Sequence, residues 1–158
     1  MKTIAVAESC TGGLISHLIT NKAGSSQYFK LGVVVYSNEA KISLLKIPSK
    51  IIEQFGSVSS QVALLMARQI RKLAKTDIGL GITGIAGPAL PKLPKDDPLP
   101  PTRWKWWEIG LVYIAVSSVK GNECKKFNFS GSRKEIKEKA AKQALKILEI
   151  AIKQEENV

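Results

Sequence analysis

The chain has 158 residues, of which 44% are hydrophobic and 23% are charged. This composition is typical of a globular protein with one core and excludes a wholly disordered or fibrous chain. The formal net charge of +11 suits a polyanionic partner, but basic residues outnumber acidic ones in each of residues 1–87, 88–131 and 132–158, so no single segment carries the excess.

The first half of the chain alternates strand and helix patterns. Residues 3–7 are an apolar, β-branched run typical of a strand, and Gly12 and Gly13 are followed by apolar residues at helical spacing. Residues 31–36 do not alternate in polarity, which predicts a strand buried on both faces. A polar turn follows, where Asn38 is the expected N-cap of a helix with Lys41 in its first turn.

Pro48 and Gly56 bound a short helix, residues 62–73 show a longer helical stripe, and residues 77–83 return to strand character. Residues 88–108 contain six of the seven prolines and all three tryptophans, and this segment is expected to be a long loop insertion. Residues 109–119 and 124–129 predict an antiparallel hairpin, and a capping box formed by Ser132 and Glu135 opens a closing helix.

This order of elements predicts an α/β fold. Strands and helices alternate early and a hairpin comes late, which favours a three-layer α/β/α sandwich with a mixed central sheet. We expect residues 1–158 to form a single domain. Ligands of such sheets bind beyond the carboxyl ends of the strands, where the polar turns of this sequence lie.

Several functional classes lack their signatures in the sequence. No RNP-like motif, zinc-finger spacing or helix-turn-helix pattern accompanies the positive charge, so nucleic acid is not the expected partner. Cys10, Cys124 and His17 lie in unrelated contexts, and we expect no metal site. No apolar run approaches the roughly 20 residues that span a bilayer, and no signal-peptide pattern is present. We therefore expect a cytoplasmic protein without membrane contact.

The first polar turn offers a candidate nucleophile. Ser9 lies directly before a Gly-Gly helix start, where unpaired backbone N–H groups can hold a phosphate or stabilise an oxyanion. The donors expected to do so belong to Thr11, Gly12 and Gly13. Cys10 is a rival nucleophile, although a small buried residue is its more common role.

A serine nucleophile needs a base. His17 falls within a predicted helix, so a Ser-His-Asp triad is not available from an obvious position. Lys41 can act as a base if burial or the positive end of a helix lowers its pKa from about 10.4 toward 7 or 8. Tyr36, at the end of its predicted strand, is a second candidate. The residues alone leave the choice between Lys41 and Tyr36 open.

One formal motif match is discounted. Residues 79–84 satisfy the Gly-x-Gly-x-x-Gly pattern of dinucleotide-binding folds. Gly87 and Pro88 stand where that fold begins a helix, and the acidic residue expected about 20 positions later is not in a strand context. A dinucleotide site is therefore not predicted.

Four segments resemble the CinA C-terminal domain family in the same order. They are residues 7–13 (Ala-Glu-Ser-Cys-Thr-Gly-Gly), 23–26 (Ala-Gly-Ser-Ser), 36–41 (Tyr-Ser-Asn-Glu-Ala-Lys) and 83–88 (Thr-Gly-Ile-Ala-Gly-Pro). Characterised members of the family are nicotinamide-nucleotide amidohydrolases. The resemblance implies hydrolysis of nicotinamide mononucleotide to nicotinic acid mononucleotide and ammonia, without a metal or cofactor.

The resemblance also implies roles for individual residues. Ser9 would be the nucleophile, and Lys41 with Tyr36 would handle protons. The residues implied to bind the substrate or its phosphate are Thr11, Gly12, Gly13, Asn38, Thr83 and Arg133. A homodimer is expected, partly because the helix that usually precedes the first strand of the family is absent here and apolar surface would otherwise be exposed.

The sequence also departs from the family pattern. The loop at residues 88–108 is longer and differs in sequence, and Ser132 replaces the usual aspartate. These departures keep two other interpretations open. The first is a nucleotide-binding protein with reduced catalysis, and the second is a basic protein associated with nucleic acid.

Overall fold

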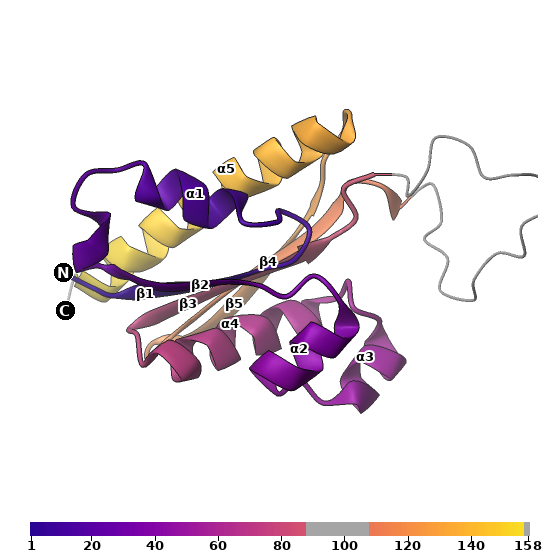
Figure 1. The fold of residues 1–158 in the computed structure, drawn as a ribbon, viewed down its shortest axis with the longest axis horizontal. Coiled ribbons are helices and arrows are strands. Elements are labelled where there is room, and N and C mark those ends of the chain that lie inside the picture. The colour runs from indigo at the N-terminus through magenta and orange to yellow at the C-terminus, as the bar shows by residue number, and fades with distance from the viewer. Residues whose placement is uncertain (88–107, 157–158) are drawn as a thin grey trace, which may run out of the picture.

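The computed structural model describes residues 1–87 and 108–156 (Figure 1). The expected loop insertion at residues 88–108, including the three tryptophans, lies outside the described residues except for Glu108. The elements are β1 (Ile4–Glu8), α1 (Leu14–Thr20), η1 (Ser25–Gln27), β2 (Phe29–Val34), α2 (Asn38–Leu45), α3 (Ser49–Phe55), α4 (Ser60–Ala74), β3 (Ile78–Gly84), β4 (Leu111–Ser118), β5 (Gly121–Asn128) and α5 (Arg133–Glu156).

The five strands form one mixed sheet in the order β2-β1-β3-β4-β5. Strands β1, β2 and β3 are parallel, whereas β4 is antiparallel to both β3 and β5. The prediction of a mixed sheet with a late hairpin is therefore confirmed. Because the three parallel strands are neighbours, the polar turns that follow them lie next to one another at the carboxyl ends of these strands.

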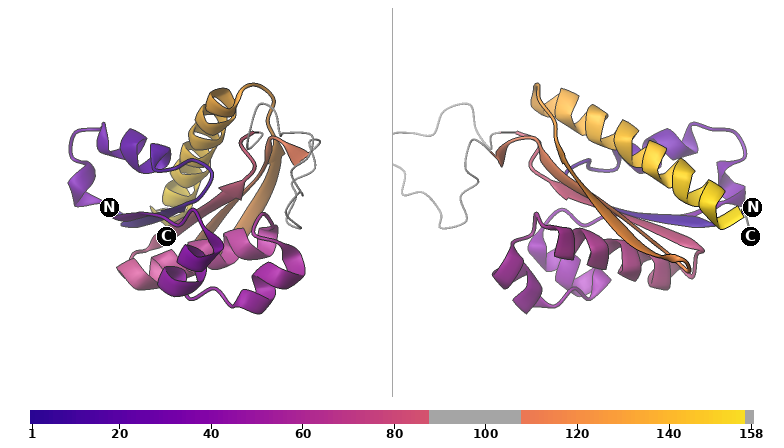
Figure 2. Two further views of the ribbon diagram at one scale, coloured as in Figure 1. Left: turned by 45° about the vertical axis from the view of Figure 1, so that its right-hand side comes forward. Right: turned by 180° about the vertical axis from the view of Figure 1, so that it is seen from behind.

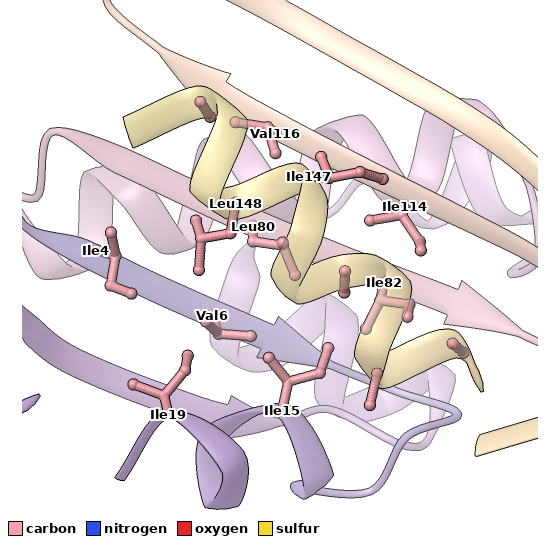
Figure 3. Packing of buried hydrophobic residues seen from close by; sticks show 14 of the residues in the cluster. Ile4, Val6, Ile15, Ile19, Leu80, Ile82, Ile114, Val116, Ile147 and Leu148 are labelled. Carbon is pink, nitrogen blue, oxygen red and sulfur yellow. The ribbon is translucent and has the colours of Figure 1, made fainter. Parts of the chain in front are cut away.

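Helices cover both faces of the sheet. Figure 1 shows α1 and α5 on one face and α2, α3 and α4 on the other, and Figure 2 shows the three layers from two further directions. Side chains of β1 alternate between the two cores, since Ile4 and Val6 pack under α1 and α5 while Ala5 and Ala7 face α4. Figure 3 shows the first of these cores. The predicted α/β/α sandwich is confirmed.

Strand β2 differs from the expectation. It was predicted to be buried on both faces, but none of its residues is fully buried, and Lys30, Gly32 and Val34 are exposed. The physical reason is its place at the edge of the sheet, with a single strand neighbour and an incomplete cover of helices. The strands buried along nearly their whole length are β1 and β3 in the sheet interior.

The glycines of β3 allow α4 to lie directly on the sheet. A Cβ atom at Gly79 would lie 2.2 Å from the carbonyl oxygen of Ala67, and one at Gly81 would lie 2.5 Å from the carbonyl oxygen of Ala63. These distances are far below van der Waals contact, so only glycine fits. The Gly-x-Gly pattern therefore serves the packing of a helix against a strand. Its match to the dinucleotide-binding motif needs no nucleotide to explain it.

The closing helix begins as predicted. The backbone N–H of Ser132 donates to the Glu135 carboxylate at 2.6 Å, and the N–H of Glu135 donates to the Ser132 hydroxyl at 3.2 Å. This reciprocal pair is the expected capping box. It places Arg133, the first residue of α5, at the same end of the molecule as the carboxyl ends of β1 and β3.

Candidate active site

The polar turns surround a cavity of about 500 Å³. It lies beyond the carboxyl ends of the parallel strands, which is where α/β sheets bind ligands. Its volume is in the range of small-molecule sites. The predicted site residues that line it are Ser9, Tyr36, Lys41, Thr83 and Arg133.

Lys41 lies directly against Ser9. Its Nζ atom is 3.1 Å from Ser9 Oγ in a buried contact, although 32 positions separate the two residues. The same amine donates to the carbonyl oxygens of Val35 at 2.9 Å and Tyr36 at 3.2 Å. When Lys41 is neutral, its two N–H groups can remain on these carbonyls, which directs the lone pair of the amine toward the Ser9 hydroxyl.

The surroundings of Lys41 weaken its hold on a proton. Lys41 is 2% exposed, and this burial lowers the pKa of its amine to about 8. Lys41 is the fourth residue of α2, one position later than predicted, because the N-cap is Ser37 and not Asn38. The Ser37 hydroxyl accepts a hydrogen bond from the N–H of Ala40 at 3.0 Å, so Asn38 becomes the first residue of the helix.

The Tyr36 side chain points to a different partner. Its hydroxyl accepts a hydrogen bond of 2.7 Å from Nη2 of Arg133, and the residue is 59% exposed. Arg133 also reaches the carbonyl oxygen of Gly87 through Nη1, at 3.5 Å. Tyr36 and Arg133 therefore connect two sides of the cavity. In this arrangement Lys41, not Tyr36, holds the Ser9 hydroxyl.

The start of α1 is already occupied by an internal anion. Both carboxylate oxygens of the fully buried Glu8 accept hydrogen bonds from this region. The donors are the hydroxyls of Thr11 and Ser16 and the N–H groups of Gly13, Ile15 and Ser16, at 2.7–3.1 Å.

These bonds bear on Thr11, Gly12 and Gly13, whose phosphate or oxyanion role stays a prediction. The Thr11 hydroxyl and the Gly13 N–H donate to Glu8, and the Gly12 N–H donates to the carbonyl oxygen of Ser9 at 3.1 Å. The N–H groups of Gly12 and Gly13 are thus engaged within the chain, whereas Thr11 contributes its hydroxyl to these bonds and not its backbone N–H. The same three residues do line a second cavity beside the first.

The two remaining predicted residues differ in outcome. Thr83 is buried, lines the first cavity and donates from Oγ1 to the carbonyl oxygen of Ser57 at 2.8 Å. Asn38 is exposed and is not among the described residues that line either cavity. The expected position of Asn38 in the pocket thus differs from the structure, in which Asn38 is an exposed first residue of α2.

Cys10 lines the same cavity but is poorly suited to attack. It is almost fully buried, and burial raises the pKa of its thiol to about 12. A thiol with this pKa stays protonated at neutral pH, and the thiolate is the reactive form. Of the two candidate nucleophiles, Ser9 is therefore the one with a proton acceptor at hydrogen-bond distance.

Three residues that shape the candidate site were not predicted from the sequence. Ser57 and Val58 line the cavity from the segment between α3 and α4, and no chemical pattern in the sequence distinguishes them. Glu8 organises the start of α1, and here a signal existed. A lone carboxylate at the end of an apolar strand, directly before a glycine-rich helix start, is placed to satisfy helix N–H groups.

The sequence model of the CinA C-terminal domain matches residues 1–152. The chain belongs to the CinA C-terminal domain family. This confirms the resemblance drawn from the four motifs. Three of those motifs supply Ser9, Tyr36, Lys41 and Thr83 to the first cavity of this CinA domain.

Relatives support this membership. CinA-like proteins of Koribacter versatilis and Syntrophomonas wolfei are 46% and 45% identical to the CinA domain over 135 and 147 residues, or 85% and 93% of this chain. The matched segments are 30% and 32% of those proteins, so the chain spans about a third of the length of the curated relatives it matches.

Solved structures share the fold. The competence or damage-inducible protein from Enterobacter asburiae aligns with a TM-score of 0.81 and 31% identity, covering 95% of this chain and 87% of that one. The competence/damage inducible protein CihA from Agrobacterium tumefaciens also aligns with a TM-score of 0.81, at 32% identity, covering 96% of this chain and 86% of that one.

Two further observations concern metals and membranes. Among residues 1–87 and 108–156, no three side chains of His, Cys, Asp or Glu gather as a set of metal ligands. No helix in the described part of the CinA domain is both long and apolar enough to span a bilayer.

Proposed function

We propose that this CinA domain is an amidohydrolase that converts nicotinamide mononucleotide to nicotinic acid mononucleotide and ammonia. The observation that carries the proposal is the buried contact of 3.1 Å between Lys41 Nζ and Ser9 Oγ at the wall of a substrate-sized cavity. A hydroxyl held by an amine with a pKa near 8 is a suitable nucleophile for an acyl transfer. The choice of substrate rests on the resemblance of the four motifs to characterised amidohydrolases.

In the first step, Ser9 Oγ attacks the carboxamide carbon and its proton moves to neutral Lys41. Lys41 then returns that proton to the departing nitrogen, which leaves as ammonia and breaks the C–N bond. An ester between Ser9 and the nicotinoyl group remains. In the second step, water attacks this ester, Lys41 takes a proton from the water and returns it to Ser9 Oγ, and the carboxylic acid is released.

Ammonia release from nicotinamide mononucleotide tests the proposal. We expect Ser9→Ala and Lys41→Met to lower kcat by about 10³-fold or more, because each removes one half of the nucleophile–base pair. Cys10→Ala is the matched control, since it changes the neighbouring cavity residue and leaves that pair intact. Equal rates in wild type, Ser9→Ala and Lys41→Met would overturn the mechanism.

The two other interpretations predict binding without turnover, which binding assays detect. A nucleotide-binding protein with reduced catalysis would bind nicotinamide mononucleotide in calorimetry and release no ammonia over hours. A protein associated with nucleic acid would retard DNA or RNA in a low-salt gel shift, with an affinity that falls steeply as salt is added. Either result, in place of turnover, would contradict the proposed function.

A further inference from the structure

Lys41 is a buried amine without an ionic partner. Its side chain is among the largest that are fully buried in the structure. Among residues 1–87 and 108–156, no carboxylate lies at ion-pair distance from its Nζ atom. Glu39, whose charge acts on this amine, is exposed on α2, and Glu8 directs its carboxylate to the start of α1. A buried ammonium group without a counter-charge is costly, so protonated Lys41 would gain from an anion in the cavity.

The lining of the first cavity supplies no such anion. Its residues in the described part of the chain include two cations, Lys41 and Arg133, and no carboxylate. The Cys10 thiol stays neutral, because burial raises its pKa to about 12. The Tyr36 hydroxyl is bonded to Arg133, and the lining residues from β3 onward to Gly87 and from the segment between α3 and α4 have uncharged side chains. The counter-charge for Lys41 must therefore come from a ligand.

The hydrogen bond between Lys41 and Ser9 can run in two directions. Neutral Lys41 keeps its two N–H groups on the carbonyl oxygens of Val35 and Tyr36 and accepts the Ser9 proton, so Ser9 Oγ presents lone pairs to the cavity. Protonated Lys41 has a third N–H group, which donates to Ser9 Oγ across the same 3.1 Å. The hydroxyl proton of Ser9 is then free to donate to a group in the cavity.

These two states of Ser9 suit different ligands. A lone pair on Oγ suits the electrophilic carbon of an amide and repels a carboxylate oxygen. A hydroxyl proton backed by an ammonium group suits a carboxylate, which is an acceptor only. The amide substrate and the acid product of the proposed reaction differ at this group, because the carboxylic acid is ionised at neutral pH.

We propose that the first cavity retains the carboxylate product when Lys41 is protonated, so that the product inhibits the enzyme and does so more strongly at lower pH. In this complex Lys41 donates to Ser9 Oγ, and the Ser9 hydroxyl donates to the carboxylate. The complex also removes the neutral amine that the first step of turnover needs. This inference rests on the proposed function and adds a regulation of the same site.

Calorimetry of the full chain with nicotinic acid mononucleotide tests this inference. Because the pKa of Lys41 is about 8, its ammonium form falls from about nine-tenths of the free protein at pH 7 to about one-tenth at pH 9. The Kd of the product should therefore be about 10-fold higher at pH 9 than at pH 7. The phosphate of this ligand ionises near pH 6 and changes little over that range. Titrations at pH 8 in two buffers of different ionisation enthalpy should show the uptake of about half a proton per product bound.

Three variants separate the ion pair from general effects of charge. Lys41→Met should bind the product with a Kd that does not change between pH 7 and 9, without proton uptake. Ser9→Ala keeps the amine but lacks the donor to the carboxylate, so its Kd at pH 7 should rise about 10-fold. Lys50→Met is the control, since Lys50 is an exposed lysine on α3 that does not line the cavity, and it should behave as wild type.

Several outcomes would overturn the proposal. They are equal Kd values at pH 7 and 9 in wild type, the same pH dependence in wild type and Lys41→Met, and unchanged product binding by Ser9→Ala. In assays of ammonia release, the inhibition constant of the product should rise with its Kd. Product binding with the expected pH dependence, but without turnover by wild type, would support this inference and refute the proposed amidohydrolase. Turnover with product affinity equal at both pH values would refute this inference alone, so the two failures are distinguishable.

Discussion

Nη2 of Arg133 donates a hydrogen bond of 2.7 Å to the Tyr36 hydroxyl across 97 positions of sequence. The contact joins the turn after β2 to the start of α5 at the mouth of the first cavity. It leaves Lys41 as the group that holds the Ser9 hydroxyl. The two residues that sequence alone could not separate as bases thus have different partners.

Tyr36→Phe and Lys41→Met should therefore have unequal effects. The phenylalanine variant removes the acceptor of Arg133 but preserves the contact between Lys41 and Ser9, so we expect kcat to fall by less than about 10-fold. Lys41→Met removes the base, for which about 10³-fold is expected. Steady-state ammonia release measures both. A Tyr36→Phe enzyme as inactive as Lys41→Met would identify the tyrosine as the base instead.

The pH dependence of turnover should follow the amine of Lys41. The neutral amine is the active form, and its pKa is about 8, so kcat/KM is expected to rise with pH and level off above that value. Tyr36→Phe should retain the same profile. A profile of kcat/KM that is flat between about pH 6.5 and 9.5 would contradict a base with this pKa.

Stability should depend on pH in the same direction. The folded-state pKa of Lys41 lies below its ordinary value of 10.5, so between about 8 and 10.5 the unfolded chain binds more protons at this site. The free energy of unfolding contributed by Lys41 therefore increases as pH rises through this window, by at most about 1.4 kcal/mol per pH unit. Urea unfolding at several pH values measures it. Lys41→Met should lack this contribution, and an identical pH dependence in both proteins would refute the assignment.

Glu8→Gln should destabilise the fold and the turn that carries Ser9. Both oxygens of Glu8 accept hydrogen bonds, so the amide group of glutamine would place a donor against donors in a buried site. Each buried group left without a partner costs about 1–3 kcal/mol. Chemical denaturation measures the change, with the exposed Glu53→Gln as the control. Equal stability of the two variants would show that Glu8 does not organise the start of α1.

Gly81→Ala tests the close packing of α4 on β3. The added methyl group would lie 2.5 Å from the carbonyl oxygen of Ala63 and 2.6 Å from the N atom of Ala67. Both are backbone atoms of α4, which cannot change position by a side-chain rotation. We expect a loss of about 3 kcal/mol, at the upper end for overpacking. Gly24→Ala, with open space but a φ of +80°, should cost about 1 kcal/mol. Thermal unfolding that ranks the two variants in the opposite order would contradict this packing.

The fold was largely predictable because its signals are local. The apolar run of β1, the capping box of Ser132 and Glu135, and the late hairpin each depend on residues close in sequence, and all appear in the structure. The burial of β2 was not predictable in this way. Whether an apolar strand lies inside a sheet or at its edge depends on strand order, which is set by packing across the whole domain.

Some features of the candidate site were likewise predictable from the sequence, and others were not. Ser9 and Lys41 could be named from their places in turns and helix starts, and Arg133 from the family resemblance. The occupation of the α1 donors by Glu8, the exposure of Asn38 and the roles of Ser57 and Val58 could not. These depend on which groups reach the same space after folding.

By itself, the sequence determined the element types, the mixed α/β architecture, the family resemblance and a short list of reactive residues, because periodicity, capping and turn chemistry act over a few residues. The tertiary structure alone decided that Lys41 meets Ser9, that Tyr36 meets Arg133, and that the helix start beside Ser9 is closed by a carboxylate. Hydrogen bonds of about 3 Å between distant segments require each backbone to be positioned by the packed core, and no local pattern encodes that distance.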